Sequence, residues 1–127
     1  MAKVLGIGGV FFKAQNSKVL GEWYQTHLGI ELDPSFGGSH FLPEQLPQGS
    51  YSVWAPFKTD TSYFEPSDQG YMINLIVDDL EACLGQVQSG GGKIVGTPEE
   101  YPFGRFGWFI DPEGNKVELW QPKATAS

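Results

Sequence analysis

The stretch 111–122, DPEGNKVELWQP, contains a tight turn that leads into a short strand. Asp111 suits the first position of a β-turn, Pro112 supplies the fixed φ of the second, and Gly114 suits the fourth. The residues on both sides of the turn alternate in the way that is typical of strands. The pattern therefore predicts an antiparallel hairpin. Its two strands are expected at 105–110 and 115–120.

The second strand of this hairpin carries a carboxylate between apolar neighbours. Successive side chains of a strand point to opposite faces of the sheet. If Val117 and Leu119 face a packed layer, then Lys116, Glu118 and Trp120 face the other side. A carboxylate and a tryptophan are thus expected to share one surface.

Composition limits the classes of protein to consider. The chain has 127 residues, 40% of them hydrophobic and 18% charged, which fits one globular domain spanning 1–127. Its net charge of -7 and only eight Lys and Arg residues argue against a nucleic-acid partner. No apolar run reaches the roughly 20 residues that a membrane helix needs. The single cysteine, Cys83, leaves no internal disulfide, so we expect a cytoplasmic protein.

Two helices are indicated by capping residues and apolar periodicity. Asn16 or Ser17 suits the start of the first helix, and Gly29 suits its end. Asp78 or Asp79 suits the start of the second, whose apolar stripe contains Leu80, Cys83, Leu84 and Val87. On this stripe Cys83 is interpreted as a packing residue. Strands are expected at 4–13, 30–32, 40–42, 51–57, 71–77, 93–95, 105–110 and 115–120.

The element order repeats, which predicts two related modules. The segment PQGSYSVWAP, 47–56, matches PEGNKVELWQP, 112–122, and places Ser52 opposite Glu118 once one gap is allowed. We therefore expect an α+β fold of two βαβββ modules, about 4–57 and 71–122, joined by a connector at 58–70. Together they would form a cup-shaped, partly open eight-stranded barrel with the helices outside.

Three segments resemble the vicinal oxygen chelate superfamily, the glyoxalase and bleomycin-resistance fold. They are WYQTHLGI, LIVDDLEACL and FIDPEGNKVELWQP. This superfamily contains isomerases, epimerases, dioxygenases, thiol transferases and drug-sequestering proteins, so the resemblance implies a fold and no single activity. It also implies a homodimer in which a partner chain completes a cup.

The resemblance further implies four metal-ligand positions, which here hold Gly9, Ser52, Met72 and Glu118. Glycine has no side chain, a neutral serine is a poor ligand, and a thioether suits copper rather than the hard or borderline ions of these enzymes. We therefore predict no metal and no cofactor.

The predicted cup favours binding of an unidentified small molecule. The expected ligand-binding residues are Phe11, Ser52, Trp54, Met72, Asn74 and Trp120, which surround Glu118 with a mostly apolar lining.

Three roles are open for Glu118. It could hold a donor or cation of a ligand in a metal-free binding cup. It could instead serve as acid or base in a metal-independent enzyme such as a lyase or isomerase, or be a structural partner of a cation such as Arg105. His40 could reach the rim of the cup, and Tyr63 and Phe64 of the connector could cap it or line an interface.

Overall fold

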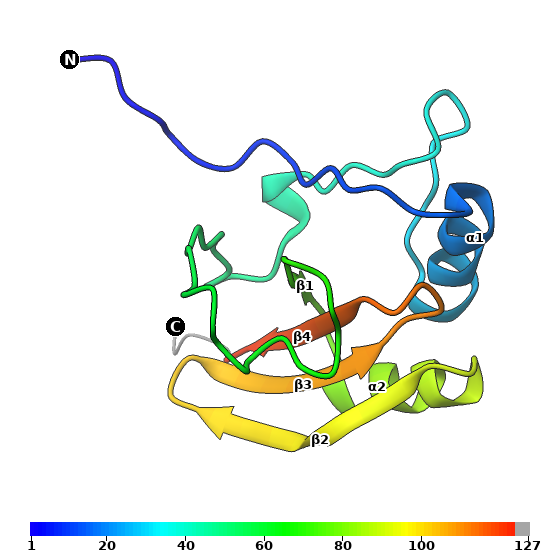
Figure 1. Cartoon of the computed structure of the whole chain (residues 1–127). Helices are drawn as coiled ribbons and strands as arrows, with labels where there is room; N and C mark the ends of the chain where they lie inside the picture. Colours follow the sequence, from blue (N-terminus) through cyan, green and yellow to red (C-terminus); the bar gives the residue numbers. More distant parts are fainter. Residues whose placement is uncertain (124–127) are drawn as a thin grey trace.

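The computed structural model describes residues 1–123 and has an α+β fold with one open, four-stranded sheet (Figure 1). Its elements in chain order are α1 (Ser17–Leu28), the short 3-10 helix η1 (Pro43–Gln45), β1 (Ile73–Ile76), α2 (Leu80–Ser89), β2 (Lys93–Tyr101), β3 (Gly104–Ile110) and β4 (Lys116–Pro122). Within this range, neither helix is long and apolar enough to cross a membrane.

The strands are ordered β1-β4-β3-β2 across the sheet. β1 runs parallel to β4, whereas β4, β3 and β2 are antiparallel neighbours. One face of this sheet packs against α2, and α1 packs beside α2 (Figure 1). The core between these layers is made by Leu20, Tyr24, Leu80, Leu84, Val87, Phe109, Val117 and Leu119.

Both helices begin where the sequence predicts, and α1 also ends there. The Asn16 side chain accepts a hydrogen bond from the backbone N–H of Val19, and Gly29 ends α1 with a φ of 69°. The Asp79 side chain accepts one from the backbone N–H of Ala82 at the start of α2. Cys83 packs against the edge of the core, as its place on the apolar stripe predicts.

The turn between β3 and β4 is confirmed. The backbone N–H of Gly114 donates to the carbonyl of Asp111 at 3.0 Å, and Gly114 has a φ of 83°. Ile110 and Lys116 are then the first paired residues of the hairpin. This pairing fixes which residues of β3 and β4 lie opposite one another.

The first half of the chain differs from the expectation. None of the four strands expected at 4–13, 30–32, 40–42 and 51–57 forms, and the sheet has four strands instead of eight. Leu5 is 90% exposed and Val53 is 65% exposed, so apolar burial does not offset the entropic cost of ordering these segments. Alternation predicts the two faces of a strand, but a strand also needs a neighbour for its backbone hydrogen bonds.

One strand is longer than expected. The sequence predicts a strand at 93–95, whereas β2 continues to Tyr101. Gly96 and Pro98 argue against a strand there. The structure accommodates them at a shift of register between Val95 and Glu99.

Candidate functional site

The face of the sheet that points away from α2 carries a row of polar and aromatic side chains, and we call it the open face. Asn74 of β1 pairs with Glu118 of β4, which in turn pairs with Trp108 of β3. Because paired residues point to the same side of a sheet, the three side chains lie next to one another. The alternation predicted for β4 therefore holds: Glu118 faces away from the core formed by Val117 and Leu119.

Glu118 is buried on this face, with 8% of its surface exposed, and both of its carboxylate oxygens accept hydrogen bonds. Asn74 Nδ2 donates to Oε1 at 2.6 Å, and Trp108 Nε1 donates to Oε2 at 2.8 Å. The hydroxyl of Tyr63 also donates to Oε2, at 2.5 Å. All three donors are uncharged, and each supplies part of the compensation that a buried carboxylate requires.

Lys116 provides a buried ammonium group on the same face, with 7% of its surface exposed. Its Nζ donates to the backbone carbonyl of Tyr63 at 2.6 Å and lies 5.2 Å from the centre of the Tyr63 ring. It also lies 5.9 Å from the centre of the Trp108 ring. Desolvation lowers the pKa of Lys116, while the charges of Glu118 and Glu65 oppose that shift.

Tyr63 brings the connector 58–70 onto the open face, in front of β3 and β4 (Figure 1). Its ring stacks on Phe57 at 5.7 Å between centroids and meets Trp108 edge-on at 6.3 Å. Burial raises the pKa of the Tyr63 phenol, and the neighbouring Glu118 raises it further. Of the two aromatic residues that the sequence leaves open, Tyr63 covers the carboxylate and Phe64 packs beside Phe57.

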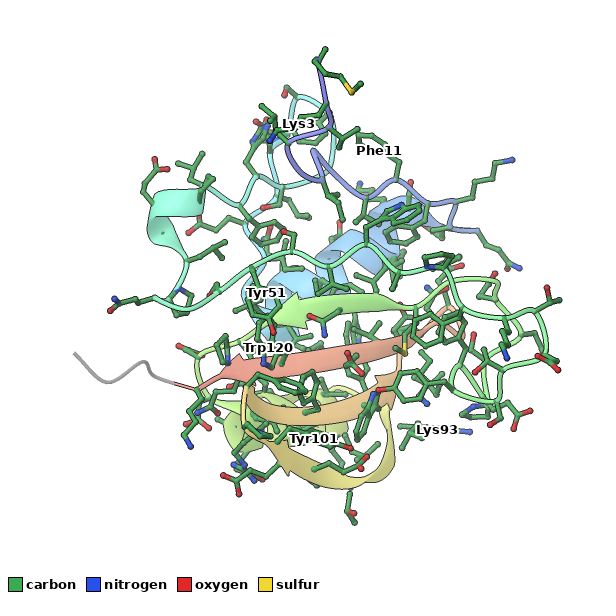
Figure 2. All side chains as sticks on the ribbon, turned by 90° about the vertical axis from the view of Figure 1, so that its left-hand side faces the viewer. Lys3, Phe11, Tyr51, Lys93, Tyr101 and Trp120 are labelled. Carbon is green, nitrogen blue, oxygen red and sulfur yellow. The ribbon has the colours of Figure 1, made fainter. Side chains whose placement is uncertain are left out.

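Aromatic side chains extend the open face beyond Glu118. Trp120 is 4% exposed, and its ring is parallel to that of Phe106 at 6.0 Å between centroids. Tyr51 meets Trp120 edge-on at 4.8 Å, and Tyr101 meets Phe106 in the same manner at 5.8 Å (Figure 2). The surface next to the carboxylate is thus aromatic, with Trp120 buried and the rings of Tyr51 and Tyr101 exposed.

The structure brings together only part of the predicted ligand-binding set. Asn74, Glu118 and Trp120 share the open face. Phe11 is 96% exposed and lies well apart from Trp120 (Figure 2). The other three predicted residues have no hydrogen bond to Glu118: Ser52 and Trp54 are exposed in an irregular segment, and Met72 is half-buried just before β1.

The alternative partner, Arg105, is on the wrong side of the sheet to pair with Glu118. It alternates with Phe106 along β3 and therefore points toward α2, where it forms an ion pair with Glu81. Of the cations considered in the structural alternative, Arg105 is therefore not the partner of Glu118. His40 lies in a loop against Phe36, at 5.2 Å between ring centroids, and is exposed.

Sequence reasoning missed Trp108 as a partner of Glu118. The turn places Ile110 opposite Lys116. Two residues further along each strand, Trp108 lies opposite Glu118, and a step of two residues keeps the same face of the sheet. The predicted hairpin alone would therefore have identified Trp108. The contact of Tyr63 with Glu118 had no comparable pattern, since the connector lacks regular periodicity.

The residues at the four implied metal positions do not fit a metal ion. Glu118 is the one carboxylate among them, and its two oxygens already accept hydrogen bonds from Asn74, Tyr63 and Trp108. Across residues 1–123, no group of three or more His, Cys, Asp or Glu side chains could hold a metal ion. We therefore derive no metal-dependent chemistry for this face.

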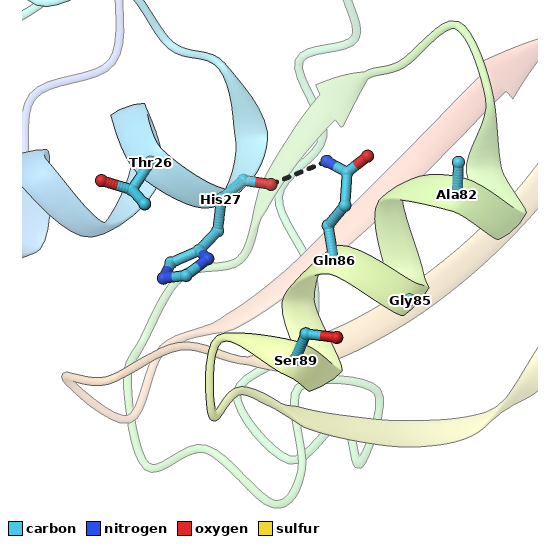
Figure 3. Close-up of a pocket in the computed structure, with 6 residues that line it drawn as sticks. All are labelled: Thr26, His27, Ala82, Gly85, Gln86 and Ser89. Carbon is cyan, nitrogen blue, oxygen red and sulfur yellow. Dashed lines mark hydrogen bonds between the residues drawn. The ribbon is translucent and has the colours of Figure 1, made fainter.

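A hollow of about 470 Å³ lies between α1 and α2, on the helix side of the sheet (Figure 3). The side chain of Gln86 crosses it and donates to the backbone carbonyl of His27 at 2.8 Å. Its walls are small or neutral polar side chains apart from His27, and it lies across the sheet from Glu118. The lining residues are Thr26, His27, Ala82, Gly85, Gln86 and Ser89. Its chemistry makes it a weaker candidate than the open face.

Comparison with solved structures identifies the fold. The chain is similar to a glyoxylase/bleomycin resistance protein/dioxygenase domain from Frankia sp. EAN1pec, with a TM-score of 0.56 and 12% identity over 95% of this chain and 100% of that one. It is also similar to a glyoxalase/bleomycin resistance protein/dioxygenase superfamily member from Sphaerobacter thermophilus DSM 20745. The TM-score is 0.50 and the identity 24%, over 95% of this chain and 98% of that one.

A shorter alignment relates the chain to TnmS3, an antibiotic binding protein from Streptomyces sp. CB03234. It has 34% identity and a TM-score of 0.38, and it covers 42% of this chain and 45% of TnmS3. The chain thus spans less than half of TnmS3. No protein-family model and no curated protein matches the chain.

Proposed function

We propose that this chain, which has the vicinal oxygen chelate fold, is a metal-free protein that binds a small molecule on its open face. The observation that carries the proposal is the buried carboxylate of Glu118, surrounded by hydrogen-bond donors and bordered by the parallel rings of Trp120 and Phe106. A few placed polar groups within an aromatic surface are how small-molecule sites are commonly built.

The roles in this site follow from its geometry. Glu118 accepts a hydrogen bond from the ligand, and Asn74 and Trp108 hold the carboxylate in position. Trp120 is buried and supports the exposed ring of Tyr51, which offers a surface to a planar group. We further propose a completed cup, in which the first half of the chain would add its four strands to the sheet. The residues of this cup would include Phe11, Ser52, Trp54 and Met72.

The alternative is a metal-independent enzyme, a lyase or isomerase that uses Glu118 as acid or base. A substrate proton would then have to reach an oxygen that already accepts hydrogen bonds from the protein. Binding needs only that a donor group of the ligand reach such an oxygen, with no transfer of the proton, and for this reason we prefer it.

We also propose a homodimer, because large apolar side chains of the first half are left exposed by the rest of residues 1–123. Val4 is 87% exposed, Phe11 96% and Trp54 79%. Exposed apolar surface of this extent is typical of an interaction site. A second copy would cover it and supply the missing neighbours for the strands. On the grounds of the single cysteine, we further propose a cytoplasmic location.

Glu118→Gln tests the binding function, with Glu81→Gln as the matched control. Glu81 is a carboxylate on the helix side, paired with Arg105, and lies outside the proposed site. We expect a planar aromatic compound, found by thermal-shift screening of the wild-type protein, to lose about tenfold or more in affinity with Glu118→Gln and none with Glu81→Gln. Equal affinity for all three proteins would overturn the role of Glu118.

Two further measurements address the remaining parts of the proposal. A stoichiometric divalent ion in protein purified without chelators would contradict the metal-free site. Conversion of the bound compound by the wild-type protein, lost in Glu118→Gln, would favour the enzyme over the binding protein.

A further inference from the structure

We propose that Tyr63 occupies the place of the ligand, and that the ligand is an uncharged phenol that also carries a carbonyl acceptor. The inference rests on the proposed binding function and names its ligand class. Tyr63 belongs to the connector rather than to the sheet, and 39% of its surface is exposed. The groups that receive it are buried: Glu118 is 8% exposed, Lys116 7% and Trp108 6%.

The contacts of Tyr63 define the chemical groups that a small molecule would need at this place. Its hydroxyl donates to Glu118, and its backbone carbonyl accepts from Lys116 Nζ at 2.6 Å. The ring between these two groups lies under the Lys116 ammonium at 5.2 Å and against the edge of Trp108 at 6.3 Å. A donor, a planar ring and an acceptor are thus recognised together by two buried charged residues, Glu118 and Lys116, and one indole.

Displacement of Tyr63 would leave both charged groups short of partners. Within residues 1–123, the Tyr63 carbonyl is the only hydrogen-bond acceptor of Lys116 Nζ. Glu118 Oε2 would keep Trp108 Nε1 alone. Because a buried charge without partners is costly, a molecule that enters here must replace both hydrogen bonds. Apolar rings without these groups cannot do so.

The charges around the site exclude an anionic ligand. Besides Glu118, the carboxylates of Glu65 and Glu99 act electrostatically on Lys116 and Tyr63. Lys116 is thus influenced by Glu118 and Glu65, and the Tyr63 phenol by Glu118 and Glu99, so a carboxylate or phosphate on the ligand would be repelled. A neutral phenol meets no such penalty.

The connector can release Tyr63 at modest cost. No helix or strand forms between residues 58 and 70, and the other contacts of Tyr63 are local: its backbone N–H donates to Thr61 Oγ1, and its ring stacks on Phe57. Ligand and Tyr63 therefore compete for Glu118, so the wild-type protein binds more weakly than a protein without this phenol.

The test uses N-acetyl-L-tyrosinamide, which carries the ring, hydroxyl and carbonyl of Tyr63, and N-acetyl-L-phenylalaninamide, which lacks the hydroxyl. Both are titrated by calorimetry into the wild-type protein, Tyr63→Ala and Phe36→Ala. The last variant removes an exposed ring from a distant loop. We expect Tyr63→Ala to bind the tyrosine amide about tenfold more tightly than the wild type does, and about tenfold more tightly than it binds the phenylalanine amide.

Tyr63→Phe guards against a folding defect in the alanine variant, because it keeps the ring and its stacking on Phe57. It removes only the competing hydroxyl, so we expect it to bind the tyrosine amide several-fold more tightly than the wild type does. Affinity equal to that of the wild type in both variants, or equal affinity for the two amides in Tyr63→Ala, would overturn the inference.

The outcomes separate this inference from the binding function itself. If planar compounds bind the wild type through Glu118 while Tyr63→Ala does not distinguish the two amides, the phenol class is wrong and the binding function stands. If neither the amides nor any planar compound binds in a manner that depends on Glu118, both proposals fail.

Discussion

The hydroxyl of Tyr24 in α1 donates a hydrogen bond to Asp111 Oδ2 at 2.9 Å and so fastens the first helix to the turn between β3 and β4. Both residues are buried, with 9% and 5% of their surfaces exposed. Asp111 Oδ1 also accepts from the backbone N–H groups of Glu113 and Asn115. The turn that defines the hairpin is therefore also the docking point for α1.

Tyr24→Phe should lower the free energy of unfolding by about 1–2 kcal/mol, because Asp111 loses one buried donor while the ring remains. Urea unfolding followed by far-UV circular dichroism measures the change. Tyr101→Phe is the matched control: its hydroxyl bonds to Glu99 on the exposed surface, so we expect a change within about 0.5 kcal/mol. Equal effects of the two substitutions would contradict the role of the Tyr24–Asp111 bond.

The same pair makes stability depend on alkaline pH. Burial, followed by the charge of Asp111, raises the pKa of the Tyr24 phenol well above its ordinary value of 10.0. Above pH 10 the Tyr24 phenol loses its proton in the unfolded chain but retains it in the folded chain. The free energy of unfolding therefore falls as pH rises, by up to about 1.4 kcal/mol per pH unit.

Comparison with Tyr24→Phe isolates this effect. The pKa values of Tyr63 and Tyr71 are also raised, so these groups change stability with pH in the same direction as Tyr24. The pKa of Lys116 is lowered, so it changes stability in the opposite direction. All three groups are present in both proteins. Urea unfolding at a series of pH values between about 8 and 11 should show the difference between wild type and variant shrinking above pH 10. A constant difference would mean that Tyr24 ionises equally in both states.

Glu113 of the same turn supports the start of α1 across the chain. Its carboxylate accepts from the backbone N–H groups of Gln15 at 2.8 Å and Asn16 at 2.9 Å. Glu113→Ala should cost about 0.5–1.5 kcal/mol, because two N–H groups lose their acceptor and the helix N-terminus loses a favourable negative charge. Glu100→Ala, on exposed β2, should leave the urea midpoint nearly unchanged; a similar loss there would point to a general charge effect.

Local chemistry explains why the sequence predicted the second half well. The Asp79 cap, the turn at Gly114 and the alternation of β4 each depend on residues close in sequence, and all are found in the structure. The face shared by Glu118 and Trp120 follows from the same alternation. These features need no knowledge of distant parts of the chain.

The remainder depended on contacts that no local pattern encodes. The strand expected at 4–13 has the right residue types, but it pairs with no strand among the residues that the structure describes. Tyr63 reaches Glu118 across 55 positions from an irregular connector. In the same way, the bond from Tyr24 of α1 to Asp111 could not be predicted from the turn itself, although the turn was identified.

Gly107, which packs against α2, and Gly85, which lies within α2, should respond oppositely to alanine. A Cβ at Gly107 of β3 would lie 2.9 Å from Leu84 Cδ1, so Gly107→Ala should destabilise the fold by about 1–3 kcal/mol through overpacking. A Cβ at Gly85 in α2 meets nothing within 4 Å, so Gly85→Ala should stabilise by about 0.5–1 kcal/mol. Thermal unfolding gives both signs, and a loss of stability with Gly85→Ala would show that the surface of α2 is covered.

The proposed dimer makes a prediction about the first half of the chain. β1 is an edge strand, and Leu5 and Phe11 are 90% and 96% exposed, so a second copy has both a strand edge and an apolar surface to cover. Light scattering after size-exclusion chromatography should give twice the chain mass. Leu5→Asp with Phe11→Asp should give the mass of one chain and less strand by circular dichroism, because the segment loses its neighbour. Phe36→Asp, at a distant loop, should remain dimeric; a wild-type protein with the mass of one chain at every concentration would refute the dimer.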